Sequence, residues 1–324
     1  MNKAISFYTP RSNFIRNIGY SEASFYMVNA LQKLGYEVPF DSPKPKTQLH
    51  FCQPTYFADA LRSNQNKLAL IPWESSEPME DWIEILKEVD ELWATSTWCK
   101  KIYESWGLEV SRVYPHGISS HWSPKRKKPG AVLKFLHAGE PSPRKGGQMA
   151  YQAFKAAFGD REDVCLYIKT RDHSTIRNKQ NGSIVSRDLG KNVKLMPVDL
   201  PEESLITLYQ QCDFLVYPSY GEGFGFFGLQ GLATGTPTIC TAEWAEYKEF
   251  LGPLALDSKY IDSPWQEMHP GQVVEPNFEQ LVEHLRYCAA NVDELHQQFY
   301  KQAFDVHTRF DWNELTRKAF ENVI

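Results

Sequence analysis

The stretch Tyr217-Pro218-Ser219-Tyr220-Gly221-Glu222-Gly223-Phe224-Gly225-Phe226-Phe227-Gly228-Leu229-Gln230 carries the strongest structural signal in this chain of 324 residues. It follows a short apolar run, 214–217, and continues into a helical pattern over 226–234. Glycines between a strand and a helix leave backbone N–H groups exposed at the positive end of the helix dipole. We therefore expect an anion site in this loop, with Glu222 beside it and Gln230 about two helical turns further along.

Short β-rich runs alternate with helical patterns on both sides of this loop. The best-marked helix of the first half covers 22–34, with Ser21 as its N-cap and Gly35 at its end. Strands separated by helices predict right-handed crossovers and parallel, doubly wound α/β sheets. The polar, proline-rich stretch 119–130 interrupts this alternation of strands and helices and is predicted to be a linker. We therefore predict two such domains that face each other across a cleft.

The composition is that of an ordinary globular protein, with 42% hydrophobic and 23% charged residues. No apolar run approaches the roughly 18 residues of a membrane span, and the first eight residues hold no secretory block. We expect a cytoplasmic protein without integral membrane association. The cysteines are too far apart for a disulfide ladder or a C-x-x-C metal site. A net charge of −5 argues against a protein that coats nucleic acid, but it allows a local basic groove.

A second cluster, Gly139-Glu140-Pro141-Ser142-Pro143-Arg144-Lys145-Gly146-Gly147, follows the first apolar run of the second half. Arg144 can grip phosphate oxygens with its planar fork, and Lys145 offers a point charge. Lys169 and Arg171 stand at the end of the next β-rich run along the chain. Because the carboxyl ends of parallel strands meet at one edge of a sheet, we expect these four cations to form one positive pocket. For each cation alone, a solvated surface charge is the alternative.

The triplet Gly223-x-Gly225-x-x-Gly228, with Glu243 twenty positions after its first glycine, matches the spacing of a dinucleotide-binding fingerprint. This interpretation would make the chain an NAD-dependent oxidoreductase. However, five residues separate the strand from Gly223, and phenylalanines fill the spacer positions. A third interpretation is that the glycines serve only the tight packing of strand against helix.

With these motifs in view, the chain resembles the retaining glycosyltransferases of the GT-B fold, family 4. Their hallmark loop, Pro-Ser-x-x-Glu-Gly-Phe-Gly, fits the residues from Pro218 to Gly225, and their Lys-Gly diphosphate site is similar to Lys145-Gly146. The resemblance extends to Gly235-Thr236-Pro237, Pro115-His116-Gly117-Ile118 and Trp73-Glu74-Ser75. The combination of motifs is similar to a branch associated with tailed bacteriophages.

The resemblance implies an N-terminal, acceptor-binding Rossmann-like domain over 1–122 and a C-terminal, nucleotide-sugar-binding domain over 123–304. It also implies that the last helix, within 305–324, returns to the first domain. The expected reaction moves a sugar from a nucleoside diphosphate donor, such as a UDP-sugar or a GDP-sugar, to a hydroxyl. No Asp-x-Asp motif occurs, so we expect neither a metal nor another cofactor.

The predicted catalytic residues are Glu222, Lys145, Arg144 and Glu74. By resemblance, Glu222 holds the sugar hydroxyls, the two cations stabilise the leaving diphosphate, and Glu74 replaces a family histidine. The predicted donor-binding residues are Gly19, Lys169, Arg171, Met196, Pro197, Ser219, Gly221, Gly223, Phe224, Gly225 and Gln230. The predicted acceptor-binding residues are Tyr20, Ser21, Trp73 and His116.

Two positions depart from the family pattern. Gln230 stands where a second glutamate holds the ribose hydroxyls, and Glu140 stands where an arginine follows the glycine of the Lys-Gly loop. Glutamine cannot accept two hydroxyl protons with the strength of a carboxylate. A sugar-nucleotide binding module without catalysis therefore remains an alternative.

The acceptor is the least determined part of the prediction. A lipid acceptor is disfavoured because the helical pattern over 78–89 is acidic rather than basic. A hydroxymethylated pyrimidine in phage DNA and a soluble glycan both remain. Candidate contacts to DNA phosphates are Arg11, Arg16, Lys100, Lys101 and the linker cations over 125–128.

Overall fold

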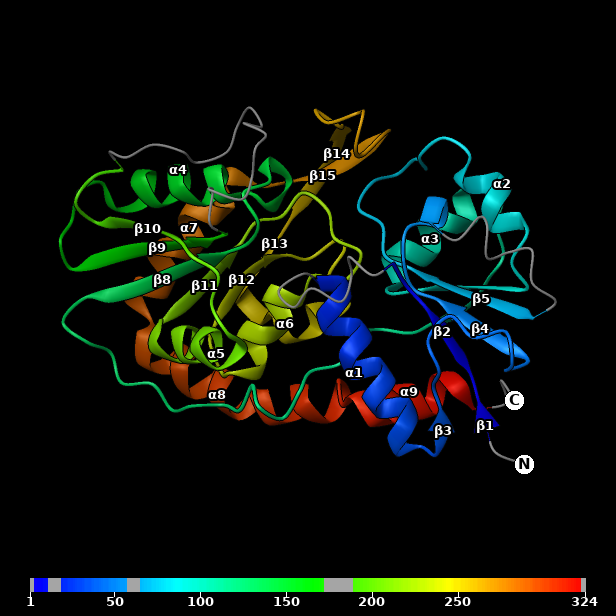
Figure 1. The fold of residues 1–324 in the computed structure, drawn as a ribbon. Helices are drawn as coiled ribbons and strands as arrows, with labels where there is room; N and C mark the ends of the chain where they lie inside the picture. Colours follow the sequence, from blue (N-terminus) through cyan, green and yellow to red (C-terminus); the bar gives the residue numbers. More distant parts are fainter. Residues whose placement is uncertain (1–2, 11–18, 57–64, 172–188, 322–324) are drawn as a thin grey trace.

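The computed structural model describes residues 3–10, 19–56, 65–171 and 189–321. The candidate DNA contacts Arg11 and Arg16 lie outside these residues. Two parallel sheets, one in each half of the chain, organise the described residues, with helices packed against them (Figure 1). The predicted α/β class and the two doubly wound halves are confirmed.

The N-terminal sheet has the strand order β2-β4-β5-β6-β7. Its strands are β2 (Ser6–Tyr8), β4 (Thr47–His50), β5 (Asn66–Ile71), β6 (Glu91–Ala94) and β7 (Val110–Val113). A short parallel pair, β1 (Lys3–Ala4) and β3 (Tyr36–Glu37), continues beyond β2. Because β4 and β5 are almost entirely buried, this sheet forms the core of its half.

The C-terminal sheet has the strand order β10-β9-β8-β11-β12-β13. Its strands are β8 (Leu133–Ala138), β9 (Val164–Thr170), β10 (Val193–Pro197), β11 (Phe214–Tyr217), β12 (Thr238–Thr241) and β13 (Ala255–Leu256). The chain runs outward from β8 to β10, returns to β11 and then runs outward on the other side. The switch point therefore lies between β8 and β11, and open α/β sheets bind ligands at such a point.

The helices fill the crossovers and the ends of the chain. Their bounds are α1 (Gly19–Lys33), α2 (Trp82–Lys87), α3 (Thr97–Ser105), α4 (Gly147–Phe158), α5 (Glu202–Gln211), α6 (Phe226–Ala233), α7 (Phe278–Ala290), α8 (Val292–Arg309) and α9 (Trp312–Phe320). Helices α4 and α7 pack together, as do α6 and α8 on the opposite face of the C-terminal sheet (Figure 1). Within the described residues, no helix combines the length and apolar character needed to cross a membrane.

Helix α9 crosses from the C-terminal half and packs against α1 (Figure 1). Trp312 stacks on Tyr26 with ring centroids 6.1 Å apart, and Arg112 donates to the carbonyl of Ala319 at 2.8 Å. The backbone of Ile118, just before the linker, also donates to Phe310 at 2.8 Å. The last helix is therefore part of the packing of the N-terminal half.

The linker is less solvated than its composition suggests. Lys127 donates to the carbonyls of Tyr209 and Cys212 at the end of α5, and burial lowers its pKa to about 8. The guanidinium of Arg126 lies 5.0 Å from the ring of Tyr300. Two of the linker cations thus contact the C-terminal half, and their contact with DNA phosphates stays a prediction.

Other expectations need local correction. Helix α1 begins at Gly19, so Ser21 lies inside its first turn and is not the N-cap. The helix expected over 78–89 is shorter because Asp81 adopts a left-handed conformation, φ 64°, directly before α2.

An antiparallel pair, β14 (Ser258–Asp262) and β15 (Gln272–Pro276), is absent from the sequence analysis. We call residues 258–276 the arm. It extends from the C-terminal half towards the N-terminal half (Figure 1). The indole of Trp98, on α3, donates to the hydroxyl of Tyr260 on the arm at 3.2 Å.

Candidate functional site

The candidate site lies at the switch point of the C-terminal sheet, between the loops that follow β8 and β11. A short 3₁₀ turn, Pro143–Lys145, follows β8 and presents Arg144 and Lys145. Gly146 then takes a left-handed conformation, φ 75°, and lies so close to the carbonyl of Pro218 that a side chain would collide with it. This close approach brings the two loops together.

Glu222 is the centre of the site. Its side chain accepts hydrogen bonds from Lys145 at 2.8 Å, from Tyr217 at 2.6 Å and from Ser219 at 2.6 Å. Arg144 lies 3.3 Å from the same carboxylate. Burial would raise the pKa of Glu222, but Lys145 and Arg144 lower it to about 2. Glu222 is therefore ionised at neutral pH although it is only 4% exposed.

Arg144 joins the two halves of the chain. Its guanidinium donates to the carbonyl of Gly221 and lies 3.6 Å from Glu74 on the N-terminal half. Burial disfavours the charged guanidinium, but Glu222 and Glu74 hold the pKa of Arg144 above its ordinary value. The cation thus stays charged between two carboxylates.

Glu74 reaches the site from the loop after β5. Burial raises the pKa of its carboxyl group, and Arg144 partly opposes that rise. Its second oxygen lies 3.9 Å from Nδ1 of His269, on the arm. His269 could not be assigned to the site from the sequence, because the segment around it shows no strand or helix periodicity.

The glycine-rich loop is pressed against the N-terminal half. A side chain on Gly221 would collide with the carbonyl of Glu74, and one on Gly223 would lie 2.6 Å from the Cα of Pro72. The carbonyl of Gly223 also accepts from Thr95 at 2.7 Å. These two glycines therefore permit the close approach of the two halves.

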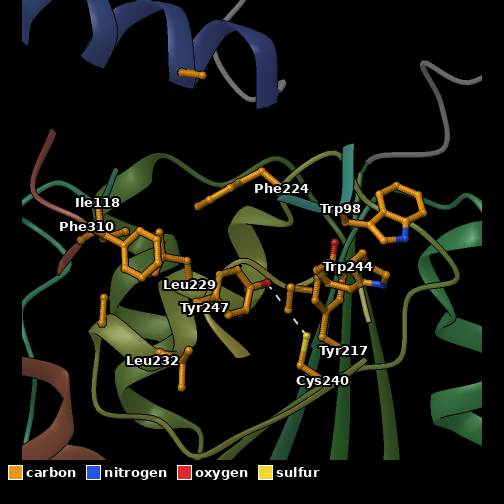
Figure 2. Close-up of a cluster of buried hydrophobic side chains, with 14 of the residues drawn as sticks. Trp98, Ile118, Tyr217, Phe224, Leu229, Leu232, Cys240, Trp244, Tyr247 and Phe310 are labelled. Atoms are coloured by element: carbon orange, nitrogen blue, oxygen red, sulfur yellow. Dashed lines mark hydrogen bonds between the residues drawn. The ribbon is translucent and has the colours of Figure 1, made fainter. Parts of the chain in front are cut away.

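The remaining glycines of the triplet serve packing inside the C-terminal half. Gly225 has φ 81° and lies against Trp244, and Gly228 lies against the hydroxyl of Tyr247. Figure 2 shows Tyr217, Trp244 and Tyr247 below the loop, with the Tyr247 hydroxyl directed towards Cys240, 3.9 Å away. Glu243, the acidic residue of the apparent fingerprint, accepts from Tyr260 at 3.0 Å. Packing therefore explains the glycine spacing that suggested a dinucleotide site.

The predicted cations divide into two groups. Arg144 and Lys145 face Glu222, whereas Lys169 lines a small adjacent pocket with Glu140 at the ends of β8 and β9. Arg171 pairs with Glu140 at 3.3 Å. Glu140 therefore neutralises part of the second group, and the single pocket of four cations stays a prediction.

Met196 and Pro197 lie on β10 beside that pocket, paired in register with Lys169 and Thr170. Met196 is half-buried and Pro197 is exposed, and the neighbouring Leu195 lines the pocket. Their assignment to a nucleotide base stays a prediction.

Gln230 meets the N-terminal half through Glu22. Its amide nitrogen donates to the Glu22 carboxylate at 3.1 Å, and its amide oxygen is buried without a partner among the described residues. Burial raises the pKa of Glu22 to about 7, and Glu202 adds to that rise. No motif in the sequence marks Glu22 as part of the site.

The predicted acceptor residues differ in their surroundings. Trp73 is 2% exposed and packs on Trp82, with ring centroids 4.4 Å apart, so it forms core rather than an open wall. His116 stacks on Phe226 at 4.9 Å, and burial lowers its pKa to about 3. His116 is therefore neutral inside an aromatic cage.

Three more predicted residues lie at the start of α1. Gly19 is exposed, Tyr20 is half-buried against Phe51, with ring centroids 5.0 Å apart, and Ser21 is buried. Burial and the neighbouring Glu74 raise the pKa of Tyr20. Phe224, predicted to bind donor, has its side chain inside the hydrophobic cluster that Figure 2 shows.

A metal centre made of protein side chains is not visible in the part of the chain that the structure describes, where no group of three His, Cys, Asp or Glu residues is suitably placed. The charged groups that meet at the site are two cations and two carboxylates. Such a set can bind an anion next to a hydroxyl-rich molecule.

A family model described as "Family 4 Glycosyltransferase in conflict systems" matches residues 103–249, the segment that holds both loops of the site. The D-inositol 3-phosphate glycosyltransferase of Corynebacterium urealyticum is 44% identical over 41 residues. That match covers 13% of this chain and spans only 10% of the relative.

Solved structures resemble nearly the whole chain. Sucrose-phosphate synthase of Thermosynechococcus elongatus has a TM-score of 0.73 at 13% identity, over 98% of this chain and 97% of its own. HepE of Anabaena, in complex with UDP and glucose, has a TM-score of 0.69 at 12% identity, over 98% of both chains. A glycosyltransferase of Rickettsia africae has a TM-score of 0.68 at 16% identity, over 98% of this chain and 97% of its own. The fold is therefore GT-B, as predicted.

Proposed function

We propose that this chain transfers a sugar from a nucleoside diphosphate to a hydroxyl, with retention of anomeric configuration. Its GT-B fold and the match of residues 103–249 to a family 4 glycosyltransferase model support this proposal. The observation that carries this proposal is the meeting of Arg144 and Lys145 with Glu222 at the switch point. Negative charge grows on the diphosphate as it leaves. Cations already fixed beside that charge stabilise the transition state.

Glu222 acts in this reaction as a fixed negative charge. With a pKa of about 2 it has no proton to give at neutral pH, and general acid–base groups work best with a pKa near the working pH. Its carboxylate can instead accept hydrogen bonds from the sugar hydroxyls. It also stabilises the positive charge of an oxocarbenium-like transition state.

We place the donor between the two loops, with its sugar towards Glu74. HepE was solved with UDP and glucose, so a UDP-sugar is the first donor to test, and GDP-sugars follow. Because Arg144 and Lys145 can neutralise a diphosphate, transfer is proposed to proceed without a metal ion.

For the acceptor we propose a hydroxyl of either a hydroxymethylated DNA pyrimidine or a soluble glycan. A pyrimidine inside a duplex must be flipped out, which costs a few kcal/mol. Of the candidate phosphate contacts, Lys101 is exposed, whereas Lys100 lies 3.7 Å from Glu104.

The test incubates the protein with UDP-, GDP- and ADP-sugars and with NADH, with and without EDTA, and measures free nucleotide. Release from one nucleotide sugar that persists in EDTA supports the proposal. Tight binding without release, even with both acceptors present, supports the binding module instead. Recovery of EDTA-treated enzyme only by Mg²⁺ or Mn²⁺ contradicts metal-independent transfer, and consumption of NADH alone contradicts the whole proposal.

The masses of the nucleosides after the reaction identify the acceptor. Hydroxymethylcytosine-containing DNA and unmodified DNA are incubated with the donor, digested to nucleosides and weighed. An added sugar mass on hydroxymethylcytosine alone supports DNA transfer. Unchanged nucleosides, with donor consumed when a glycan is supplied, support the glycan.

A further inference from the structure

His269 brings an unassigned side chain into the site. It lies on the arm, which is bound to the N-terminal half at Ser76. The backbone N–H of Ser76 donates to the carbonyl of Gln272 at 2.8 Å, and the backbone N–H of Gln272 donates to the Ser76 hydroxyl at 2.7 Å. Glu77 also donates to the carbonyl of Pro270 at 3.3 Å. The backbone directly after His269 is therefore held against the N-terminal half.

The hydrogen bonding of His269 fixes its tautomer. Nε of Arg144 donates to Nε2 of His269 at 3.2 Å, and a guanidinium only donates. Nε2 must therefore carry a lone pair. Burial, together with the charge of Arg144, lowers the pKa of His269 to about 3, so the ring is neutral and its proton is on Nδ1.

The Nδ1–H group is a buried donor without a partner among the described residues. Such groups are rare and usually meet a ligand or a water molecule. Oε2 of Glu74 lies 3.9 Å away, too far for a direct hydrogen bond. One hydroxyl oxygen placed about 2.8 Å from each atom could accept from Nδ1–H and donate to the carboxylate.

We propose that His269 and Glu74 together bind one hydroxyl of the transferred sugar. This inference rests on the proposed function and adds a residue from the arm to it. Glu74 can be reached because its side chain is 23% exposed, and Arg144 lies beside both residues at the diphosphate end. The sugar then lies between the arm and the N-terminal half.

Two substitutions distinguish the roles of the two ring nitrogens of His269. The amide nitrogen of asparagine can occupy the place of Nδ1, whereas the amide group of glutamine reaches the place of Nε2. His269→Asn therefore keeps a donor towards the sugar, and His269→Gln keeps the contact with Arg144. His284, which contacts the carbonyl of Ala255 at 3.1 Å away from the site, supplies the control variant His284→Gln.

The measured quantity is the dissociation constant of the nucleotide sugar that the wild type consumes, divided by that of its nucleoside diphosphate. Any effect through Arg144 on the diphosphate cancels in this ratio. We expect the ratio to rise about fivefold to tenfold in His269→Gln, the scale of one buried hydrogen bond, and to stay within about twofold in His269→Asn and His284→Gln.

If the wild type consumes the donor and the ratio is unchanged in His269→Gln, the inference is overturned and the proposed function stays intact. Equal increases in His269→Asn and His269→Gln also overturn it, because the Nδ1 donor would then be irrelevant. A wild type that binds no nucleotide sugar overturns both proposals.

Discussion

The glycine-rich loop 218–225 and the arm approach the same segment of the N-terminal half, residues 72–77, in different ways. The loop makes close backbone contact, with Gly221 against Glu74 and Gly223 against Pro72. The arm uses main-chain hydrogen bonds to Ser76 and Glu77. The loop contact thus depends on glycine at two positions, whereas the arm contact depends mainly on backbone groups and on the Ser76 hydroxyl.

The two regions also bring different chemistry. The loop carries Glu222, a permanent charge held by Lys145 and Arg144. The arm carries His269, a neutral ring with one free donor among the described residues. We infer that Arg144 and Lys145, which face this loop, serve the charged end of a donor, and that the arm serves its neutral end.

The largest effect should come from removing a cation that faces the loop. We expect Lys145→Ala to lower turnover at least about a hundredfold, the scale of losing one group that stabilises transition-state charge. Steady-state nucleotide release measures it, with Lys259→Ala as the control, because Lys259 is exposed on the arm. Turnover within a few-fold of wild type in Lys145→Ala would remove this lysine from the reaction.

The second effect concerns the fit of the loop. Gly223→Ala should lower the free energy of unfolding by about 1–3 kcal/mol, because the added methyl group overpacks the contact with Pro72. Urea unfolding measures this, and Gly130→Ala is the control, since its nearest atom would be 3.7 Å away. Equal stability of the two variants would show that the halves separate at no cost.

A smaller effect is expected in the arm. Gly271 has φ 76° and faces the Ser76 hydroxyl and the side chain of Glu77, which can move. Gly271→Ala should cost about 1 kcal/mol, mostly for the left-handed conformation, and Gly271→Asn should cost less. A loss in Gly271→Ala larger than that in Gly223→Ala would reverse the comparison.

The last effect is a pH dependence at a third contact between the halves, Glu22 with Gln230. The pKa of Glu22 is about 7 in the folded chain, above its ordinary value of 4.5, so this group makes folding less favourable as pH rises from about 4.5 to 7. Glu22→Gln should remove that loss. Urea midpoints at pH 4.5 and 8 test it, and parallel changes in variant and wild type would show that Glu22 titrates normally.

Much of the fold could be predicted because its periodicity is local. The buried positions of helix α4 recur at helical spacing between Gly146 and Gly159, a pattern that is visible in the sequence. The arm could not be predicted in this way. Strand β14 is mostly exposed, so it lacks the apolar alternation that marks a strand in the sequence.

The residues of the candidate site also differ in how far the sequence predicts them. Lys145 and Glu222 could be placed together because both follow strands of one parallel sheet, whose carboxyl ends share an edge. His269 and Glu22 take their places through contacts between the two halves. No spacing along the chain encodes such contacts, so the sequence alone does not reveal either residue as part of the site.

A crystal structure with the nucleoside diphosphate of the consumed donor tests the central claim most directly. The account predicts diphosphate oxygens within about 3 Å of Lys145 Nζ and the Arg144 guanidinium, between the loops that follow β8 and β11. A nucleotide bound elsewhere, with both cations still on Glu222, would contradict it.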